Sequence, residues 1–396
     1  MPEFYLRMWR ALLALLVVLA ALAPRQALAY PWMIKHGYTN CAQCHIDPSG
    51  GGTLTEYGRA QGEILVRTHY EKTAADQTPG KIKDFAFGAV TLPKPLSLQA
   101  DLRGLVIPEP GNVRTILMQA DVSGAVQAGI FTAAGSIGPV SEGGEAAWLT
   151  QNTAPNGWNL VSRDYWVGVT PMKGLLIRAG RIQLPFGIRS EDHELYVRNA
   201  TRTDGNDQQQ TGVAASYTSK KFRAEVMGIA GNFSVSPDVF RERGYSLYGS
   251  YAIKKTFELG ISSLVTEAQE DIITLAPLTR QVHGVYTRAS PVKSVAILAE
   301  ADLMLDKSPT ASTTGIASSA MVDWEPAQGL HVMGIGQYCN PDLSSSAAPA
   351  WTGGGAVEWF LVPRLDIRVD AFDGMLTCAA GGTPQGMGLL QAHFYL

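Results

Sequence analysis

Apolar and polar residues alternate along most of the chain from about residue 82 to residue 396. In segment 222–227, Arg223 and Glu225 share one face of an extended chain, and the aliphatic residues share the other. Segment 364–370 repeats the pattern, with a charged residue at every second position. A period of two predicts antiparallel β-strands that each have one apolar and one polar face.

We expect about sixteen such strands, an even number as in single-chain bacterial barrels. The candidate strands, one of which is surplus by this count, begin near Ile82, Leu96, Val113, Val126, Ser162, Gly174, Thr211, Phe222, Tyr245, Phe257, Gln281, Lys293, Gly315, Gly329, Ala350, Arg364 and Gly386.

The connections between these segments alternate in length. Short turns are expected at 170–174, 219–221, 254–255, 290–293, 325–329 and 362–364. Longer polar stretches lie between them at 138–158, 184–210, 232–243, 268–278, 305–314, 340–349 and 376–384. This alternation is typical of up-and-down outer-membrane barrels. The sequence therefore predicts an all-β fold, a transmembrane antiparallel barrel, with its short turns toward the periplasm and its long loops outside the cell.

The first residues have the features of an export signal. Arg7 and Arg10 precede an apolar run, and Ala27-Leu28-Ala29 follows it as a cleavage site. The alternative is an uncleaved anchor, but the run is shorter than the ~20 residues that a membrane-spanning helix needs. We expect a signal peptide at 1–29, a cofactor-binding segment at 30–72, a linker at 73–81 and the barrel at 82–396.

Composition agrees with a barrel and narrows the range of partners. Hydrophobic residues make up 46% of the chain and charged residues only 17%, and there are 41 glycines. The charged share is low against the roughly 25% of an average soluble domain. The net charge of −3, with no basic stripe, argues against nucleic acid as a partner and leaves outer-membrane lipid as the expected surroundings.

One motif carries recognisable chemistry, Cys41-Ala42-Gln43-Cys44-His45. In Cys-x-x-Cys-His, two thiols form thioethers to a porphyrin and the histidine becomes an axial iron ligand. A lone Cys-x-x-Cys is also found in disulfides, redox motifs and half zinc sites. A zinc site needs four ligands, and a thioredoxin-like motif needs a βαβ context, neither of which is evident here. The motif therefore predicts one covalent haem c on Cys41 and Cys44, with His45 as the metal ligand.

The residues after the motif predict a short helical unit around such a group. The glycines at 50–52 permit close approach of the backbone to a flat ring. A helix is expected from Thr53 to about Arg67, with Thr53 as its cap and Glu56 as the capping-box partner. Its apolar stripe is Leu54, Tyr57, Gln61, Ile64 and Leu65. A unit of some forty residues is too small for a full core, so we expect its fold to depend on the haem, on the barrel, or on both.

Several other features leave alternatives open. The sixth iron ligand is unassigned, with candidates Met33, His36, His69, His283, His331 and His393, and with an open position as a further alternative. Cys339 and Cys378 either form a disulfide or are unrelated. The arginines around 184–187 either line a porin-like constriction or are simple lumen charge; they are Arg178, Arg181, Arg189 and Arg198. Aromatic residues near strand ends suggest interfacial girdles: Trp166, Trp324, Trp351, Trp359, Tyr217 and Tyr251.

A signal peptide, one Cys-x-x-Cys-His motif and a barrel, in this order, resemble the fused outer-membrane monohaem cytochrome–porins, a family associated with extracellular iron oxidation. The resemblance implies that Cys41 and Cys44 bind the haem and that His45 is its proximal ligand. It implies a bacterial outer-membrane location, with the haem segment on the periplasmic side or in the barrel lumen. The implied role is passage of electrons between an extracellular donor or acceptor and a periplasmic c-type cytochrome or other carrier, with ferrous iron as one candidate donor.

Two other functions compete with this one. The first is a diffusion porin whose haem segment senses redox state or plugs the pore. The second is a barrel that only anchors a periplasmic haem. No general acid–base pair or nucleophile arrangement is evident, so any enzymatic activity would be electron transfer at the haem, such as oxidation of iron outside the cell.

Overall fold

The structure, a computed structural model, describes residues 30–70, 85–109, 111–141, 158–190, 192–205, 208–378 and 381–396. The expected signal peptide at 1–29 and linker at 73–81 lie outside these residues, as does the strand start expected at Ile82. Within the described part of the chain, no helix is both long enough and apolar enough to cross a membrane.

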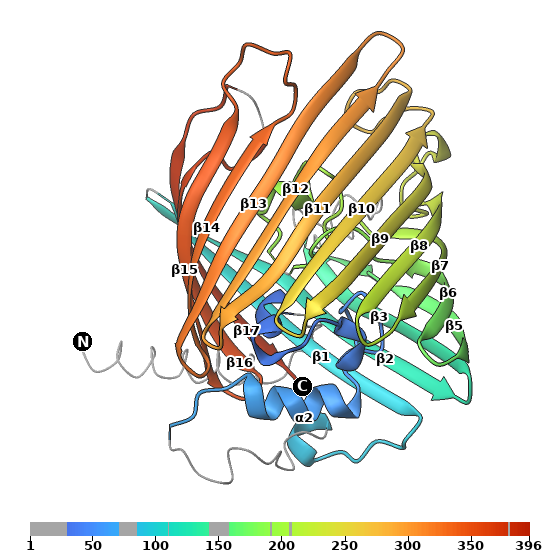
Figure 1. The fold of residues 1–396 in the computed structure, drawn as a ribbon, viewed down its shortest axis with the longest axis vertical. Helices are drawn as coiled ribbons and strands as arrows, with labels where there is room; N and C mark the ends of the chain where they lie inside the picture. Colours follow the sequence, from blue (N-terminus) through green and yellow to red (C-terminus); the bar gives the residue numbers. More distant parts are fainter. Residues whose placement is uncertain are drawn as a thin grey trace.

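Among the described residues, one antiparallel sheet of 17 strands closes on itself through the pairing of β1 with β17. Both β4 and β5 pair with β3, so together they take the place of one interrupted strand in the barrel wall (Figure 1). Counted in this way, the described barrel has sixteen strands, as the sequence predicts. The strands are β1 Leu96–Glu109, β2 Asn112–Ala128, β3 Phe131–Ser141, β4 Trp158–Val161, β5 Tyr165–Met172, β6 Leu175–Ile182, β7 Gln210–Thr218, β8 Phe222–Gly231, β9 Arg243–Lys254, β10 Phe257–Ala268, β11 Leu278–Val292, β12 Val295–Lys307, β13 Ser312–Ala327, β14 Leu330–Asn340, β15 Ala350–Val362, β16 Leu365–Gly374 and β17 Gln385–Tyr395.

The helices are short. They are η1 Pro31–His36, η2 Cys41–Gln43, α2 Glu56–Leu65, η5 Phe85–Gly88, α3 Tyr196–Asn199 and η7 Asp238–Phe240.

The barrel wall is polar inside and apolar outside. On β16, Asp366 is fully buried, whereas Val369 on the opposite face of the strand is 51% exposed. Adjacent residues of a strand point to opposite faces, so the charged residues of this strand face the lumen. A soluble sandwich buries its apolar face instead. The predicted membrane barrel and its strand pattern are therefore confirmed.

The aromatic residues expected at strand ends follow this division with one exception. Trp324, Trp351, Trp359, Tyr217 and Tyr251 are each at least 40% exposed and face outward. The prediction for Trp166 is wrong. Its side chain is 3% exposed and lies inside the wall, with the Arg178 guanidinium 5.5 Å from the ring.

Short turns gather at one end of the barrel, together with the N-terminal segment and the end of β17, and longer loops gather at the other end (Figure 1). The connection between β1 and β2 departs from the rule, because β1 ends at Glu109 and β2 already begins at Asn112 at the long-loop end. The strand expected from Val126 is also wrong. Val126 lies within β2, and β3 begins at Phe131 after a turn in which Gly129 has a φ of 61°.

Residues 30–70 fold into the short-turn end of the barrel. Helix η1 packs on β11 and β12, and α2 lies across the opening (Figure 1). The core of this segment is shared with the wall, and its buried members are Trp32, Ile34, Val66, Ala296 and Phe360. Hydrogen bonds extend the contact around the rim, from the Leu54 amide to Gln99 on β1 and from the Thr68 amide to the Phe360 carbonyl on β15.

Candidate functional site

The Cys41–His45 motif forms a compact turn. Helix η2 is capped by Asn40, whose side-chain oxygen accepts a hydrogen bond from the Ala42 amide at 3.0 Å. The Cys44 and His45 amides both donate to the Cys41 carbonyl, at 3.0 and 2.9 Å. This turn brings the two free thiols and the imidazole to one hollow. The structure thus places all three predicted site residues together.

His45 lies at the bottom of this arrangement and is 7% exposed. Its backbone pairs with Leu54, so the glycine run between them forms a tight hairpin in which Gly50 and Gly52 have φ values of 91° and 65°. The Nδ1 atom of His45 is buried without a hydrogen-bond partner among the described residues. Burial lowers the pKa of His45 to about 4, against the opposing effect of the Gly52 backbone. The imidazole is therefore neutral, the form in which histidine binds a metal.

Helix α2 forms one wall of the hollow. Its cap is Thr55, whose Oγ1 accepts a hydrogen bond from the Gly58 amide at 3.0 Å, so the predicted cap at Thr53 is wrong. Gly58 is required by packing, because a Cβ at this position would lie 2.1 Å from the Cys44 carbonyl oxygen. The predicted apolar stripe is only partly correct, since Gln61 lines the hollow but Tyr57 is 49% exposed.

The hollow has an empty volume of about 680 Å³, part of which is open to solvent. Its walls are mainly apolar, with Tyr30, Met33 and Val66 from the segment and Arg288 and Tyr395 from the barrel. A buried imidazole, two free thiols and an apolar wall fit a covalently held porphyrin. Sequence reasoning missed Arg288 and Tyr395, whose only signal was an inward position on a strand.

An ion-pair network connects the site with the barrel wall. Asp47, two residues after His45, pairs with Arg178 on β6. Arg178 also pairs with Glu225 on β8, and the second carboxylate oxygen of Glu225 lies 2.7 Å from Arg189. Arg189 belongs to the loop at 183–209 and also donates to the Pro48 carbonyl at 3.3 Å. The site, the wall and this loop are thus joined through buried charges.

The loop at 183–209 runs inside the barrel and reaches the opposite wall. The Tyr196 amide donates to Gln337 on β14 at 2.6 Å, and the Tyr196 hydroxyl bonds Thr352 on β15 at 2.6 Å. Arg198 pairs with Glu300 on β12. These contacts hold the loop across the lumen between strands of the wall.

The arginines of this region are paired rather than free in the lumen. Arg178, Arg189 and Arg198 all lie against carboxylates. Arg181 donates to the Ser234 hydroxyl at 2.8 Å. Arg189 and Arg198 attach the loop to β8 and β12, whereas Arg178 joins Asp47 of the N-terminal segment to Glu225 of the wall.

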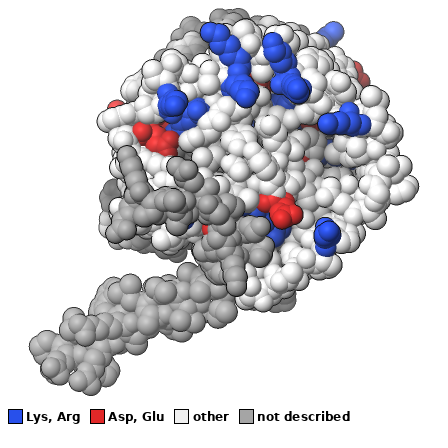
Figure 2. All heavy atoms as spheres, turned by 60° about the horizontal axis from the view of Figure 1, so that its bottom comes forward, with Lys and Arg blue, Asp and Glu red and all other residues white. Residues whose placement is uncertain are grey.

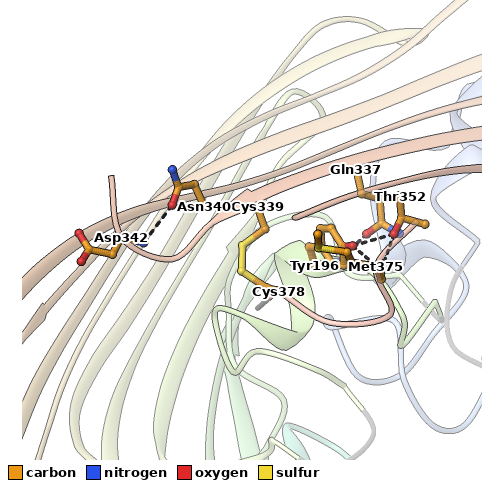
Figure 3. The surroundings of a disulfide bond; sticks show 8 residues. All are labelled: Tyr196, Gln337, Cys339, Asn340, Asp342, Thr352, Met375 and Cys378. Atoms are coloured by element: carbon orange, nitrogen blue, oxygen red, sulfur yellow. Dashed lines mark hydrogen bonds between the residues drawn. A yellow bond between two sulfur atoms is a disulfide. The ribbon is translucent and has the colours of Figure 1, made fainter. Parts of the chain in front are cut away.

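The disulfide that the sequence left open is present between Cys339 on β14 and Cys378 in the loop after β16, with their Cα atoms 5.5 Å apart (Figure 3). Close beside it, the Tyr196 hydroxyl and the Thr352 hydroxyl both bond the Met375 carbonyl. The disulfide therefore holds the same outer loop that anchors the lumen loop.

Five of the six candidates for a sixth iron ligand lie outside the walls of the hollow. His331 and His393 bond carboxylates of the wall, at 2.9 Å to Asp323 and 3.0 Å to Asp366. His283 bonds the Ser263 hydroxyl, His69 lies 3.3 Å from Gln328, and His36 lies 3.8 Å from Glu325. Met33 alone among the six lines the hollow. The described residues contain no group of three or more His, Cys, Asp or Glu that could hold a metal ion by themselves.

No protein-family model and no curated protein matches the chain. Solved structures with a similar fold are outer-membrane proteins. The trimer form of OmpT from Vibrio cholerae has a TM-score of 0.60 at 9% identity, over 76% of this chain and 99% of that one. The outer membrane channel DcaP of Acinetobacter baumannii has a TM-score of 0.54 at 11% identity, over 76% of this chain and 97% of its own. An anion-selective porin from Comamonas acidovorans has a TM-score of 0.54 at 11% identity, over 76% of this chain and 99% of that one. At these identities the likeness shows the barrel fold alone.

Proposed function

We propose that this protein is an outer-membrane electron conduit of the fused monohaem cytochrome–porin type. One haem c, bound through Cys41 and Cys44 with His45 as proximal ligand, would exchange electrons between an extracellular donor or acceptor and a periplasmic carrier. The observation that carries the proposal is the convergence of these three side chains on one hollow in the mouth of a barrel whose outer face is apolar.

The chain's own residues prepare the site for such a group. The thiols are presented from one turn, and α2 approaches that turn closely because Gly58 has no side chain. The bound haem would supply one-electron chemistry, with a potential set by its axial ligands and by burial. His45 is almost completely buried, and its backbone pairs with Leu54 across the hairpin at 46–53.

The proposed orientation places the short-turn end in the periplasm and the long loops outside the cell, as in outer-membrane barrels generally. The apolar band of such a barrel is about 25 Å tall. The proposed haem at the short-turn mouth would be within reach of a periplasmic carrier. An external donor such as ferrous iron would give one electron and become ferric iron, and the carrier would accept that electron.

The short-turn face suggests the chemistry of the carrier. Six lysines lie exposed in four adjacent turns: Lys173, Lys220, Lys221, Lys254, Lys255 and Lys293. Figure 2 shows Lys and Arg side chains around the edge of this face, with fewer Asp and Glu side chains. A basic rim beside the proposed haem edge would attract an acidic electron carrier.

The competing function is a diffusion porin with a haem-bearing plug, and the similar fold of an anion-selective porin favours it. The filled lumen argues against a diffusion porin. The N-terminal segment occupies one mouth, and the loop at 183–209 is attached to both walls by Arg189 and Arg198. A pore for free diffusion gains nothing from pairing its lumen arginines with buried carboxylates.

Reconstitution tests the proposal. The protein, produced in a host that matures c-type cytochromes, is inserted into sealed liposomes that contain an electron acceptor. A membrane-impermeant reductant is then added outside. We expect haem absorbance in the purified protein, reduction of the enclosed acceptor and little leakage of a small solute. The matched control is the double variant Cys41→Ser/Cys44→Ser, which should insert equally and transfer no electrons. Free solute passage without electron transfer would favour the porin.

A further inference from the structure

We infer that the Met33 thioether would be the second protein ligand of the iron in the proposed haem site, in addition to His45. This inference rests on the proposed haem site. The first observation is position. The thioether side chain of Met33 lines the same hollow as Cys41, Cys44 and His45, whereas the five candidate histidines lie outside its lining.

The second observation is that Met33 sits on a rigid support. Its neighbours in η1, Trp32 and Ile34, are 2% and 0% exposed and pack into the barrel wall. Lys35 is held by Asp323 at 2.7 Å and by Glu325 at 3.0 Å. Helix η1 then ends at Gly37, whose φ of 83° turns the chain away. Met33 itself packs partly against this apolar cluster and is half buried, and its side chain also lines the hollow.

The third observation concerns three of the other polar side chains that line the hollow, Tyr38, Asn40 and Arg288. The Tyr38 hydroxyl bonds Tyr57 at 2.8 Å and Gln61 at 3.0 Å. The Asn40 oxygen accepts from the Ala42 amide, and Arg288, a cation, has no lone pair to offer. The Met33 sulphur is a soft, neutral donor of the kind that binds haem iron and raises its reduction potential. A ligand of this type suits a conduit that accepts electrons from a weak external donor.

Met33→Leu tests the inference because it keeps the apolar volume and removes the sulphur. In the oxidised parent protein we expect the weak far-red absorption band of a sulphur–iron bond. The variant should lose this band and, when reduced, should bind carbon monoxide, which the parent resists. Met33→His should restore six-coordination and lower the reduction potential. Met172→Leu, at the exposed end of β5, is the matched control and should change neither property.

The outcomes separate the two proposals. A parent protein without covalent haem on a denaturing gel overturns the haem site and the ligand assignment together. A haem-loaded Met33→Leu protein that keeps the far-red band and excludes carbon monoxide overturns the ligand assignment alone. A haem-loaded parent that lacks the band and binds carbon monoxide freely has an open sixth position, and this too overturns the assignment while leaving the haem site intact.

Discussion

The ammonium group of Lys35 lies 2.7 Å from the carboxylate of Asp323, with both side chains fully buried. Lys35 belongs to the N-terminal segment and Asp323 to β13, so the pair joins the candidate site to the barrel wall. Glu325 and His331 complete the cluster, at 3.0 and 3.2 Å from the same ammonium. The segment is thus fixed by charge as well as by its shared apolar core.

Lys35→Met should release the segment from the mouth of the barrel. Removing one partner of a buried ion pair leaves an uncompensated charge and costs about 3–5 kcal/mol. Limited proteolysis within residues 30–70 should become faster, while the barrel itself stays resistant in detergent. Lys254→Met, at an exposed short-turn lysine, is the control. Equal protease resistance of both variants would show that the Lys35 cluster does not hold the segment.

Gly58→Ala should reduce covalent haem loading. The added Cβ would lie 2.1 Å from the Cys44 carbonyl, so α2 or the motif must shift. Gly334→Ala on β14 is the control, because a Cβ added there would have no atom within 4 Å and Gly334 does not line the hollow. Haem stain per mole of protein is the measurement, and equal loading of the two variants would contradict the packing argument.

Arg198→Met should raise ion conductance through the barrel. The change leaves Glu300 buried without its cationic partner, so the lumen loop should detach from β12. Single-channel recordings in planar bilayers provide the measurement. Arg241→Met is the control and should leave the conductance unchanged. It removes an ion pair with Asp238, which is 60% exposed, and such surface pairs contribute only about 0–1 kcal/mol. Unchanged conductance in Arg198→Met, despite correct insertion, would show that the loop is held by its other contacts.

Cys378→Ser should lower thermal stability at the long-loop end. The Cys339–Cys378 bond closes a chain segment with a sequence separation of 39, and such disulfides typically contribute about 2–4 kcal/mol. The melting temperature in detergent should fall, and reductant should produce the same fall in the parent protein. A parent whose melting temperature does not respond to reductant would contradict this stabilising role.

High salt should weaken association with an acidic carrier. The six lysines of the short-turn rim are exposed, so their attraction is screened as ionic strength rises. Changing Lys254 and Lys255 to Glu should slow electron exchange with an acidic cytochrome at low salt and leave exchange with a small neutral mediator unchanged. An equal decrease in the rates of both reactions would show that the substitutions disturb the proposed haem site and not the docking of the carrier.

The barrel could be predicted from the sequence because its signal is repeated in every strand. A single strand such as β16 shows alternating charge, which predicts the strand and its two faces. The alternation of short and long connections then predicts that the strands form an up-and-down barrel. The prediction of a strand from Val126 is wrong because β2 is 17 residues long, so its second half alone has the pattern of a separate strand. Trp166 was misplaced because periodicity does not show which face of a weakly charged strand points inward.

The site was predictable where its chemistry is local. The motif fixed Cys41, Cys44 and His45 by adjacency alone. The partners that come from the barrel depend on register between distant segments, and no local pattern reports that register. Arg178 meets Asp47 only because β6 lies beside the mouth into which the segment folds.

Tyr395 on β17 lines the hollow together with Cys41 and Met33, and β17 is the strand whose pairing with β1 seals the sheet. The pocket is therefore a product of the finished cylinder. A chain whose strands have not yet joined has no complete cavity, so closure of the barrel and completion of the proposed haem pocket are the same event.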